Sequence, residues 1–270
     1  MRKALLIVFL LSISAAFFAQ SKLPLDKTLL NSLVSTTLLN FDQSVKIKNF
    51  TNFHATCAKE FQKNYSPAKL KEIFEKFIQN NIDISSIRSS YPLFTSIPVI
   101  DEFGDMIVEG FYVLESSVPN LIQFTIEFRI EDSQWKPLSF KLQTFYKEKL
   151  PTTHVIIGNI NKTMVSLQQA IRTTNFASFL AKSSTPLQQK LTPAKLLDIF
   201  KDFIAKKIDV SKVTNYHPIF DQMPVIDAAG DLVLRGKYFL DNPPQTIEFK
   251  LDFREEKAEW RIIYINVDVK

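Results

Sequence analysis

Four aromatic side chains with a polar edge are the best candidates for holding a ligand in this chain of 270 residues. Tyr112 and Tyr238 each follow a glycine by two positions in a strand-like stretch, so they share its face and their phenols could reach a ligand at a pocket mouth. The alternative is a core tyrosine with its hydroxyl at the rim. Trp135 and Trp260 begin the last strand-like stretch of their segments. They could stack on a ligand, although packing over a hairpin is the commoner role.

No residue pattern specifies catalysis or metal binding. Asp101 and Asp227 form a repeated acidic position that could act as a general acid or base, but each opens an Asp-x-x-Gly turn, which explains the aspartate without catalysis. The histidines lack the short His or Cys spacings of a metal site: they are His54, His154 and His217. The chain also lacks a G-x-S-x-G nucleophile turn and a glycine-rich phosphate loop. We therefore predict no catalytic residue, no metal ligand and no cofactor.

The amino end has the layout of a secretory signal peptide. Residues 1–3 end in Arg-Lys, and residues 4–19 are apolar apart from two serines. Small residues at the required positions favour cleavage after Ala16, with cleavage after Ala19 as the alternative, and we assign residues 1–21 to the signal. The apolar run is shorter than the ~20 residues that a spanning helix needs. We expect an exported protein, periplasmic or secreted, with no membrane span after cleavage.

Charge and cysteine content exclude further kinds of partner and of stabilising bond. The formal charge is +5 and falls to +3 when the two basic residues of the signal are removed, which is too mild to indicate a nucleic-acid partner. Cys57 is the only cysteine, so no disulfide can form within the chain and the core alone must hold the fold. Its helical surroundings, without any accompanying motif, favour a small buried side chain over a nucleophile.

The chain contains an internal repeat at an offset of 126 residues. Ser66-Pro67-Ala68-Lys69-Leu70 is echoed by Thr192-Pro193-Ala194-Lys195-Leu196. Pro98-Val99-Ile100-Asp101 is echoed by Pro224-Val225-Ile226-Asp227. After one deletion in the second copy the offset becomes 125, which pairs Trp135 with Trp260. The two tryptophans are therefore one position that occurs twice.

Each copy places helical periodicity before strand periodicity, which is the order of an α+β fold. The best helix begins at Ser66 or Thr192, where the hydroxyl can cap the amino end and the following proline suits the first turn. An apolar stripe follows: Leu70, Ile73, Phe74, Phe77 and Ile78, repeated as Leu196, Ile199, Phe200, Phe203 and Ile204. Its partner is an antiparallel sheet with one buried face, because apolar and polar residues alternate at Ile122, Phe124, Ile126, Phe128 and Ile130, and again at Ile247, Phe249, Leu251 and Phe253.

Four of the five glycines occupy paired positions. Gly104 and Gly230 close the Asp-x-x-Gly turns, where a positive φ is needed. Gly110 and Gly236 interrupt strand patterns, which usually indicates a β-bulge or a bend in a curved sheet. The predicted organisation is a signal peptide over 1–21, a first domain over 22–146, a linker over 147–160 and a second domain over 161–270.

Three motifs resemble the nuclear-transport-factor-two-like superfamily, also described as cystatin-like. They are the run from Asn40-Phe41 to Phe53, Pro98-Val99-Ile100-Asp101 followed by Gly104-Asp105, and the closing strands through Trp135 and Trp260. The resemblance covers about residues 28–145 and 155–270. It implies two tandem cone-shaped α+β domains, each with amino-terminal helices packed on a curved antiparallel sheet and an optional pocket at the open end. Some members are isomerases, dehydratases or hydrolases, and many have no catalytic activity. Small secreted bacterial members of unassigned function look most similar.

These observations favour an exported, non-enzymatic binding or interaction protein with an unknown small apolar ligand or protein partner. The alternative is an isomerase- or hydrolase-type enzyme that acts on a small apolar substrate in one cone, and a purely structural envelope module is a third class. The two copies could pair within one chain as a pseudo-dimer. Charged residues on the wet strand faces favour a polar and modest contact between the copies.

Overall fold

The computed structural model describes residues 27–114, 120–147, 149–241 and 244–270, and the expected signal peptide lies outside them. The first half contains, in order, α1 (Lys27–Ile47), α2 (Thr51–Thr56), α3 (Lys59–Asn64), α4 (Pro67–Ile73), α5 (Glu75–Gln79), η1 (Ser85–Ser89), β1 (Leu93–Phe94), β2 (Val99–Ile100), β3 (Met106–Val113), β4 (Leu121–Glu131) and β5 (Gln134–Phe145). The second half repeats this order with α6 (Thr153–Thr173), α7 (Ala177–Ala181), α8 (Thr185–Lys190), α9 (Pro193–Ile199), α10 (Lys201–Ala205), η2 (Val210–Asn215), β6 (Ile219–Phe220), β7 (Val225–Ile226), β8 (Leu232–Asp241), β9 (Pro244–Glu256) and β10 (Glu259–Val269). α6 thus begins inside the range 147–160 that the sequence assigns to a linker.

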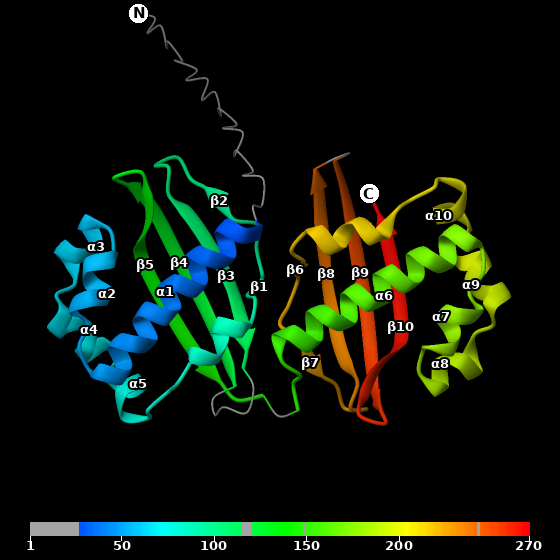
Figure 1. The fold of residues 1–270 in the computed structure, drawn as a ribbon, viewed down its shortest axis with the longest axis horizontal. Coiled ribbons are helices and arrows are strands. Elements are labelled where there is room, and N and C mark those ends of the chain that lie inside the picture. The colour runs from blue at the N-terminus through cyan, green and yellow to red at the C-terminus, as the bar shows by residue number, and fades with distance from the viewer. Residues whose placement is uncertain (1–26, 115–119, 148, 242–243) are drawn as a thin grey trace, which may run out of the picture.

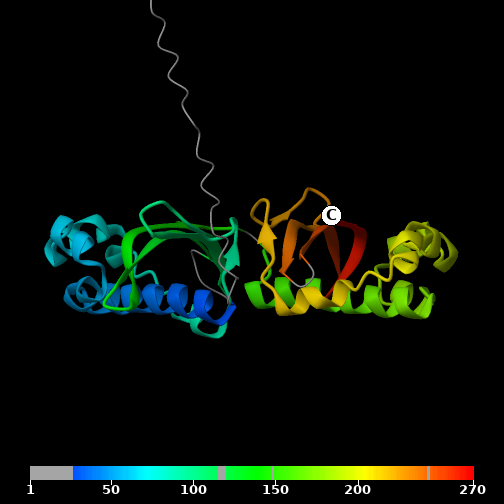
Figure 2. The ribbon, with the colours of Figure 1, turned by 90° about the horizontal axis from the view of Figure 1, so that it is seen from above.

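The strands form one continuous sheet that spans both halves (Figure 1). Its order is β10-β9-β8-β6-β1-β3-β4-β5, with β2 paired to β3 and β7 to β8. Neighbouring strands are antiparallel except at the centre, where β1 and β6 run parallel through a single pair, Phe94 and Ile219. The sheet curves and does not close on itself (Figure 2). The α+β order and the curved antiparallel sheet expected from the sequence are confirmed.

The long helices α1 and α6 lie over the same face of the sheet, and the short helices gather at its two outer ends (Figures 1 and 2). Each long helix buries one stripe at helical spacing, because a helix brings every third or fourth residue to the same side. The buried stripes are Leu30, Val34, Leu38, Phe41 and Val45 in α1, and Ile156, Ile160, Met164, Leu167 and Ile171 in α6. The two helices and the concave sheet face enclose the apolar core.

The predicted helix caps are confirmed, but the helix that follows is broken. The hydroxyls of Ser66 and Thr192 accept hydrogen bonds from the backbone N–H three residues on, with proline at the first turn. α4 ends where Phe74 leaves the helical conformation, at φ −99° and ψ 19°, and α5 begins at the next residue, Glu75. The expected single stripe is therefore wrong at Ile73 and Ile199, which are 48% and 56% exposed, because the break turns them toward solvent.

The predicted buried faces of the strands are confirmed, except at the end of β4. The inward residues of β9 are buried as expected, and β4 buries its apolar residues up to Phe128. Ile130 is 54% exposed, and it pairs with Trp135 next to the hairpin at Asp132 and Ser133. The two residues of that hairpin have positive φ, as a tight hairpin turn requires.

The paired glycines serve two purposes. Gly104 has a φ of +81°, and the Asp101 carboxylate accepts hydrogen bonds from the N–H groups of the turn, as predicted. Of the bulge or bend expected at Gly110 and Gly236, the bulge is excluded, since the pairing of β3 with β4 and of β8 with β9 continues through both without a shift. A Cβ on Gly110 would instead lie 2.4 Å from the carbonyl oxygen of Leu93. Glycine is needed there because β1 approaches too closely for any side chain.

The two halves meet at sheet edges through apolar side chains. The rings of Phe111 and Phe220 lie 6.0 Å apart, and the Val113 N–H donates to Thr153 Oγ1 at 2.8 Å, which ties β3 to the start of α6. Residues of the first half belong to the core of the second: Leu93, Phe111, Val113 and Leu121. This differs from the polar contact between wet sheet faces that the sequence favours, because the short strands β1 and β6 place edges rather than faces together.

Paired positions in the two halves make paired contacts. Asp105 binds Arg129, and Asp231 binds Arg254 in the same two-pronged geometry. The backbone N–H of Ala58 donates to Pro137 O at 2.8 Å, and that of Ser184 donates to Ile262 O at 2.9 Å. The internal repeat in the sequence therefore corresponds to repeated interactions in space.

Candidate functional site

Tyr112 and Tyr238 lie in the core rather than at a pocket mouth. Both are 0% exposed, and their rings pack against Phe124 and Phe249. Neither Oη has a hydrogen-bond partner among the described residues. Burial raises the pKa of both phenols above the ordinary value, because the charged form would lose its hydration. A ligand at the surface cannot reach these hydroxyls.

The two tryptophans begin β5 and β10, as the sequence indicates, and both are half-buried. Trp135 packs against the core of the first half, and Trp260 packs against the core of the second. Trp260 also lines a groove, so the structure brings one of the four predicted ligand-binding residues to a site that could hold a molecule.

The groove lies between α6, α7, η2 and the hairpin that joins β9 to β10. Its volume is about 1210 Å³, at or above the upper end of the ~300–1,000 Å³ typical of small-molecule pockets. The long helix α6 supplies one wall, from Val155 to Thr173, and the hairpin supplies another, from Ala258 to Ile262.

The floor of the groove is apolar. Phe179 from α7, Phe253 from β9 and Ile262 from β10 are buried core residues that also line it. Trp260 adds a large amphipathic ring, whose faces are apolar and whose indole N–H is a donor. Apolar parts of a ligand would lose water here and gain contacts with carbon atoms.

The rim of the groove carries more positive than negative charge. Its cations are Lys162, Arg172, Lys182 and Arg261, and its acids are Asp209 and Glu259. Glu259 is paired with Arg261 at 3.0 Å, and the Asp209 carboxylate accepts hydrogen bonds from the backbone and hydroxyl of Ser211. Lys162 and Lys182 have no ion pair within the described part of the chain. Two ammonium groups at the groove are thus uncompensated.

Two buried donors next to the groove also lack partners. Asn159 Nδ2 and Arg261 Nε have no hydrogen bond to any described residue. Leaving a buried donor unsatisfied costs roughly 1–3 kcal/mol. They are two of the seven buried side-chain nitrogen or oxygen atoms without a partner among the described residues, and both belong to side chains that line the groove.

The histidines, the cysteine and the tyrosines of the described residues lie outside the groove. The lining residues include no histidine, cysteine or tyrosine. Cys57 is 1% exposed and donates to the carbonyl of Phe53, and burial raises the pKa of its thiol to about 12. This agrees with the predicted small buried side chain. His217 is buried edge-on against Phe94, whereas the ring of His54 contacts the carbonyl of Gln62.

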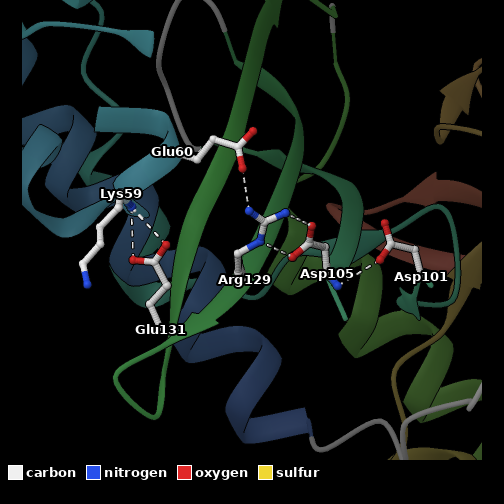
Figure 3. A network of polar contacts seen from close by, with 6 residues as sticks. All are labelled: Lys59, Glu60, Asp101, Asp105, Arg129 and Glu131. Atoms are coloured by element: carbon white, nitrogen blue, oxygen red, sulfur yellow. Dashed lines mark hydrogen bonds and ion pairs between the residues drawn. The ribbon is translucent and has the colours of Figure 1, made fainter. Parts of the chain in front are cut away.

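An acidic group that the sequence does not reveal lies at the turn after β2. Carboxylate oxygens of Asp101, Asp105 and Glu127 lie within 4.8 Å of one another, the spacing of a cation site. Arg129 already binds Asp105 through both carboxylate oxygens and reaches Glu60 on α3 (Figure 3). These hydrogen bonds raise the pKa of the Arg129 guanidinium above its ordinary value. Arg129 therefore compensates the charge of Asp105 within the protein.

The network in Figure 3 has a structural role. The Glu131 carboxylate accepts two hydrogen bonds of 3.1 Å from the backbone N–H of Lys59 at the start of α3. The second half repeats this contact between Glu256 and the N–H of Thr185. A carboxylate at a helix amino end stabilises it by satisfying a free N–H. The network fastens the short helices to the sheet in both halves.

Comparisons of the chain with family models, with curated proteins and with solved structures found no match. No helix in the described residues combines the length and the apolar character that crossing a bilayer requires.

Proposed function

We propose that this chain is an exported, non-enzymatic binding protein made of two copies of a cone-shaped domain, and that the second copy holds a ligand in the groove beside Trp260. The observation that carries the proposal is the groove itself, about 1210 Å³ with an apolar floor. Export rests on the signal-like amino end, and the duplicated cone rests on the sequence repeat and the repeated contacts.

A catalytic alternative is less well supported. An isomerase or hydrolase of this kind would need a buried acid or histidine beside a tyrosine in an enclosed cavity. The acids that line the groove are Asp209 and Glu259, each already engaged by a neighbour, and Tyr238 is buried away from it. The groove is better suited to holding a molecule than to transferring a proton.

The test uses the tryptophans as reporters in the mature chain. In a Trp135→Phe variant Trp260 is the only tryptophan, and in Trp260→Phe only Trp135 is left. The neutral apolar probe N-phenyl-1-naphthylamine is titrated into each variant, and energy transfer from tryptophan to probe is recorded. We expect a saturable signal from Trp260 and a weak or absent one from Trp135.

A second test fills the groove with a side chain and has a matched control in the first half. Ser166→Phe places a ring in the groove, and Asn40→Phe makes the same kind of change at the paired position on α1. Probe binding should fall at least several-fold in Ser166→Phe and stay unchanged in Asn40→Phe, with circular dichroism confirming that both are folded. If the two variants bind the probe equally, or if no energy transfer from Trp260 is seen, the groove is not the binding site.

A further inference from the structure

Resting on the proposed function, the charge of the groove indicates what kind of molecule it takes. We propose that it binds an amphipathic carboxylate: an apolar body lies on the floor beside Trp260, and the acid group lies against Lys162 and Lys182. The two ammonium groups have no acidic partner in the described residues, and the acids at the rim are held by Arg261 and Ser211.

The paired positions of the first half show that this charge belongs to one copy. Lys162 and Lys182 correspond to Thr36 and Thr56 at the offset of 126. The first half has the same order of helices and strands with uncharged threonines at these places, so the shared architecture does not explain the lysines. A fold requirement would have to appear in both halves, whereas a ligand requirement can appear in one.

The buried donors point to the same ligand chemistry. Asn159 corresponds to Leu33, which packs against the core of the first half. The second half thus carries a polar side chain with an unsatisfied Nδ2 where the first has an apolar one. Arg261 Nε is a second donor without a partner at the same groove. Both atoms could serve an acceptor after a small movement of their side chains, and a carboxylate offers about four acceptor positions.

Charge complementarity also selects among apolar ligands of similar size. An exposed ion pair contributes about 0.2–1 kcal/mol, so two lysines give a carboxylate a preference of roughly 2- to 30-fold over a neutral analogue. The same lysines repel a cation. Because the groups are exposed, the preference should weaken as salt screens them over a distance of about 10 Å at 0.1 M ionic strength.

The experiment compares three ligands with the same alkyl chain in the Trp135→Phe chain. Decanoate, decanol and decyltrimethylammonium, each below its micelle concentration, displace N-phenyl-1-naphthylamine from the groove. We expect decanoate to bind about 5- to 10-fold more tightly than decanol, and the cation to bind most weakly. Raising the salt from 50 to 500 mM should reduce the affinity for decanoate much more than that for decanol.

Two charge variants test the assigned residues. Lys162→Gln combined with Lys182→Gln should abolish the preference for decanoate over decanol and leave decanol binding unchanged. The control, Lys190→Gln combined with Lys206→Gln, removes two exposed lysines of the neighbouring short helices that do not line the groove, and should keep the preference.

The outcomes separate this inference from the function on which it rests. Equal affinity for decanoate and decanol, or a preference that survives in the Lys162 and Lys182 variant, overturns the carboxylate proposal. Probe binding that none of the alkyl ligands displaces also overturns it but leaves the groove as a binding site. A probe that does not bind near Trp260 at all overturns both proposals.

Discussion

Gly110→Ala should destabilise the protein through the strand that joins its two halves. A Cβ at this position would lie 2.4 Å from the carbonyl oxygen of Leu93 and 2.9 Å from the ring of Phe124. The ring can turn, but the carbonyl belongs to β1, which must move about 1 Å to restore an ordinary contact of roughly 3.4 Å. β1 has only two residues and also pairs with β6, so the displacement strains both neighbours.

The expected loss follows from two contributions. Overpacking a tight site costs about 1–3 kcal/mol, and weakening one ladder hydrogen bond adds about 1 kcal/mol. We therefore expect Gly110→Ala to lower the free energy of unfolding by about 2–4 kcal/mol. Gly236→Ala should behave in the same way, because its Cβ would lie 2.5 Å from the carbonyl oxygen of Ile219 on β6.

The assay is equilibrium urea unfolding of the mature chain, followed by circular dichroism and by tryptophan fluorescence. Gly158→Ala is the control: it lies within α6 with nothing within 4 Å of the added Cβ, so it should stabilise by roughly 0.5–1 kcal/mol through helix propensity. If Gly110→Ala unfolds at the same urea concentration as the wild type, or a higher one, the close-approach explanation is incorrect.

Three further predictions concern the junction, the thiol and one ion pair. Phe220→Ala should lower the free energy of unfolding by about 3–5 kcal/mol, because the ring joins the cores of the two halves. The urea midpoint should fall at both tryptophans, and a change at only one of them would contradict this. Cys57 should react with Ellman's reagent only as the protein unfolds, since its thiol is buried with a pKa of about 12, so rapid labelling in native buffer would disprove the burial. Hydrogen bonds from Lys46 and Ser85 lower the pKa of Asp83 to about 2, below its unfolded value of about 4. Its stabilising effect is therefore present above pH 4 and lost as the pH falls toward 2. Lys46→Gln should raise that pKa in carboxyl NMR titrations. It also removes the 2.8 Å ion pair of Lys46 with the buried Asp42 carboxylate, so the loss in the free energy of unfolding at pH 7 should exceed the ~1 kcal/mol of an exposed pair.

Local signals explain what could be predicted of the fold. The caps at Ser66 and Thr192, the Asp-x-x-Gly turns and the alternation in β4 and β9 each depend on residues within a few positions of one another. The break at Phe74 is not predicted by these local signals: the apolar spacing is that of one continuous helix, which would bury Ile73, whereas the structure has two short helices and leaves Ile73 exposed.

The candidate site was only partly predictable. Trp260 and the paired Trp135 have the same sequence signal, but the groove that Trp260 lines depends on α6, α7 and the β9–β10 hairpin coming together. Tyr112 and Tyr238 share a face with a glycine, as expected, but that face is covered by the helices. Glu127 joins the turn acids only because the register of β4 against β3 places it there.

The sequence by itself determined the repeat, the order of helices before strands, the turns and the buried strand faces, because these follow from the conformational preferences of neighbouring residues and from hydrophobic spacing. The tertiary structure alone decided that β1 and β6 join the halves into one sheet, that the carbonyl of Leu93 requires a glycine at position 110, and that Lys162 and Lys182 line one groove with Trp260. These features arise between segments far apart in the chain, where close packing and charge pairing are set by distance in space.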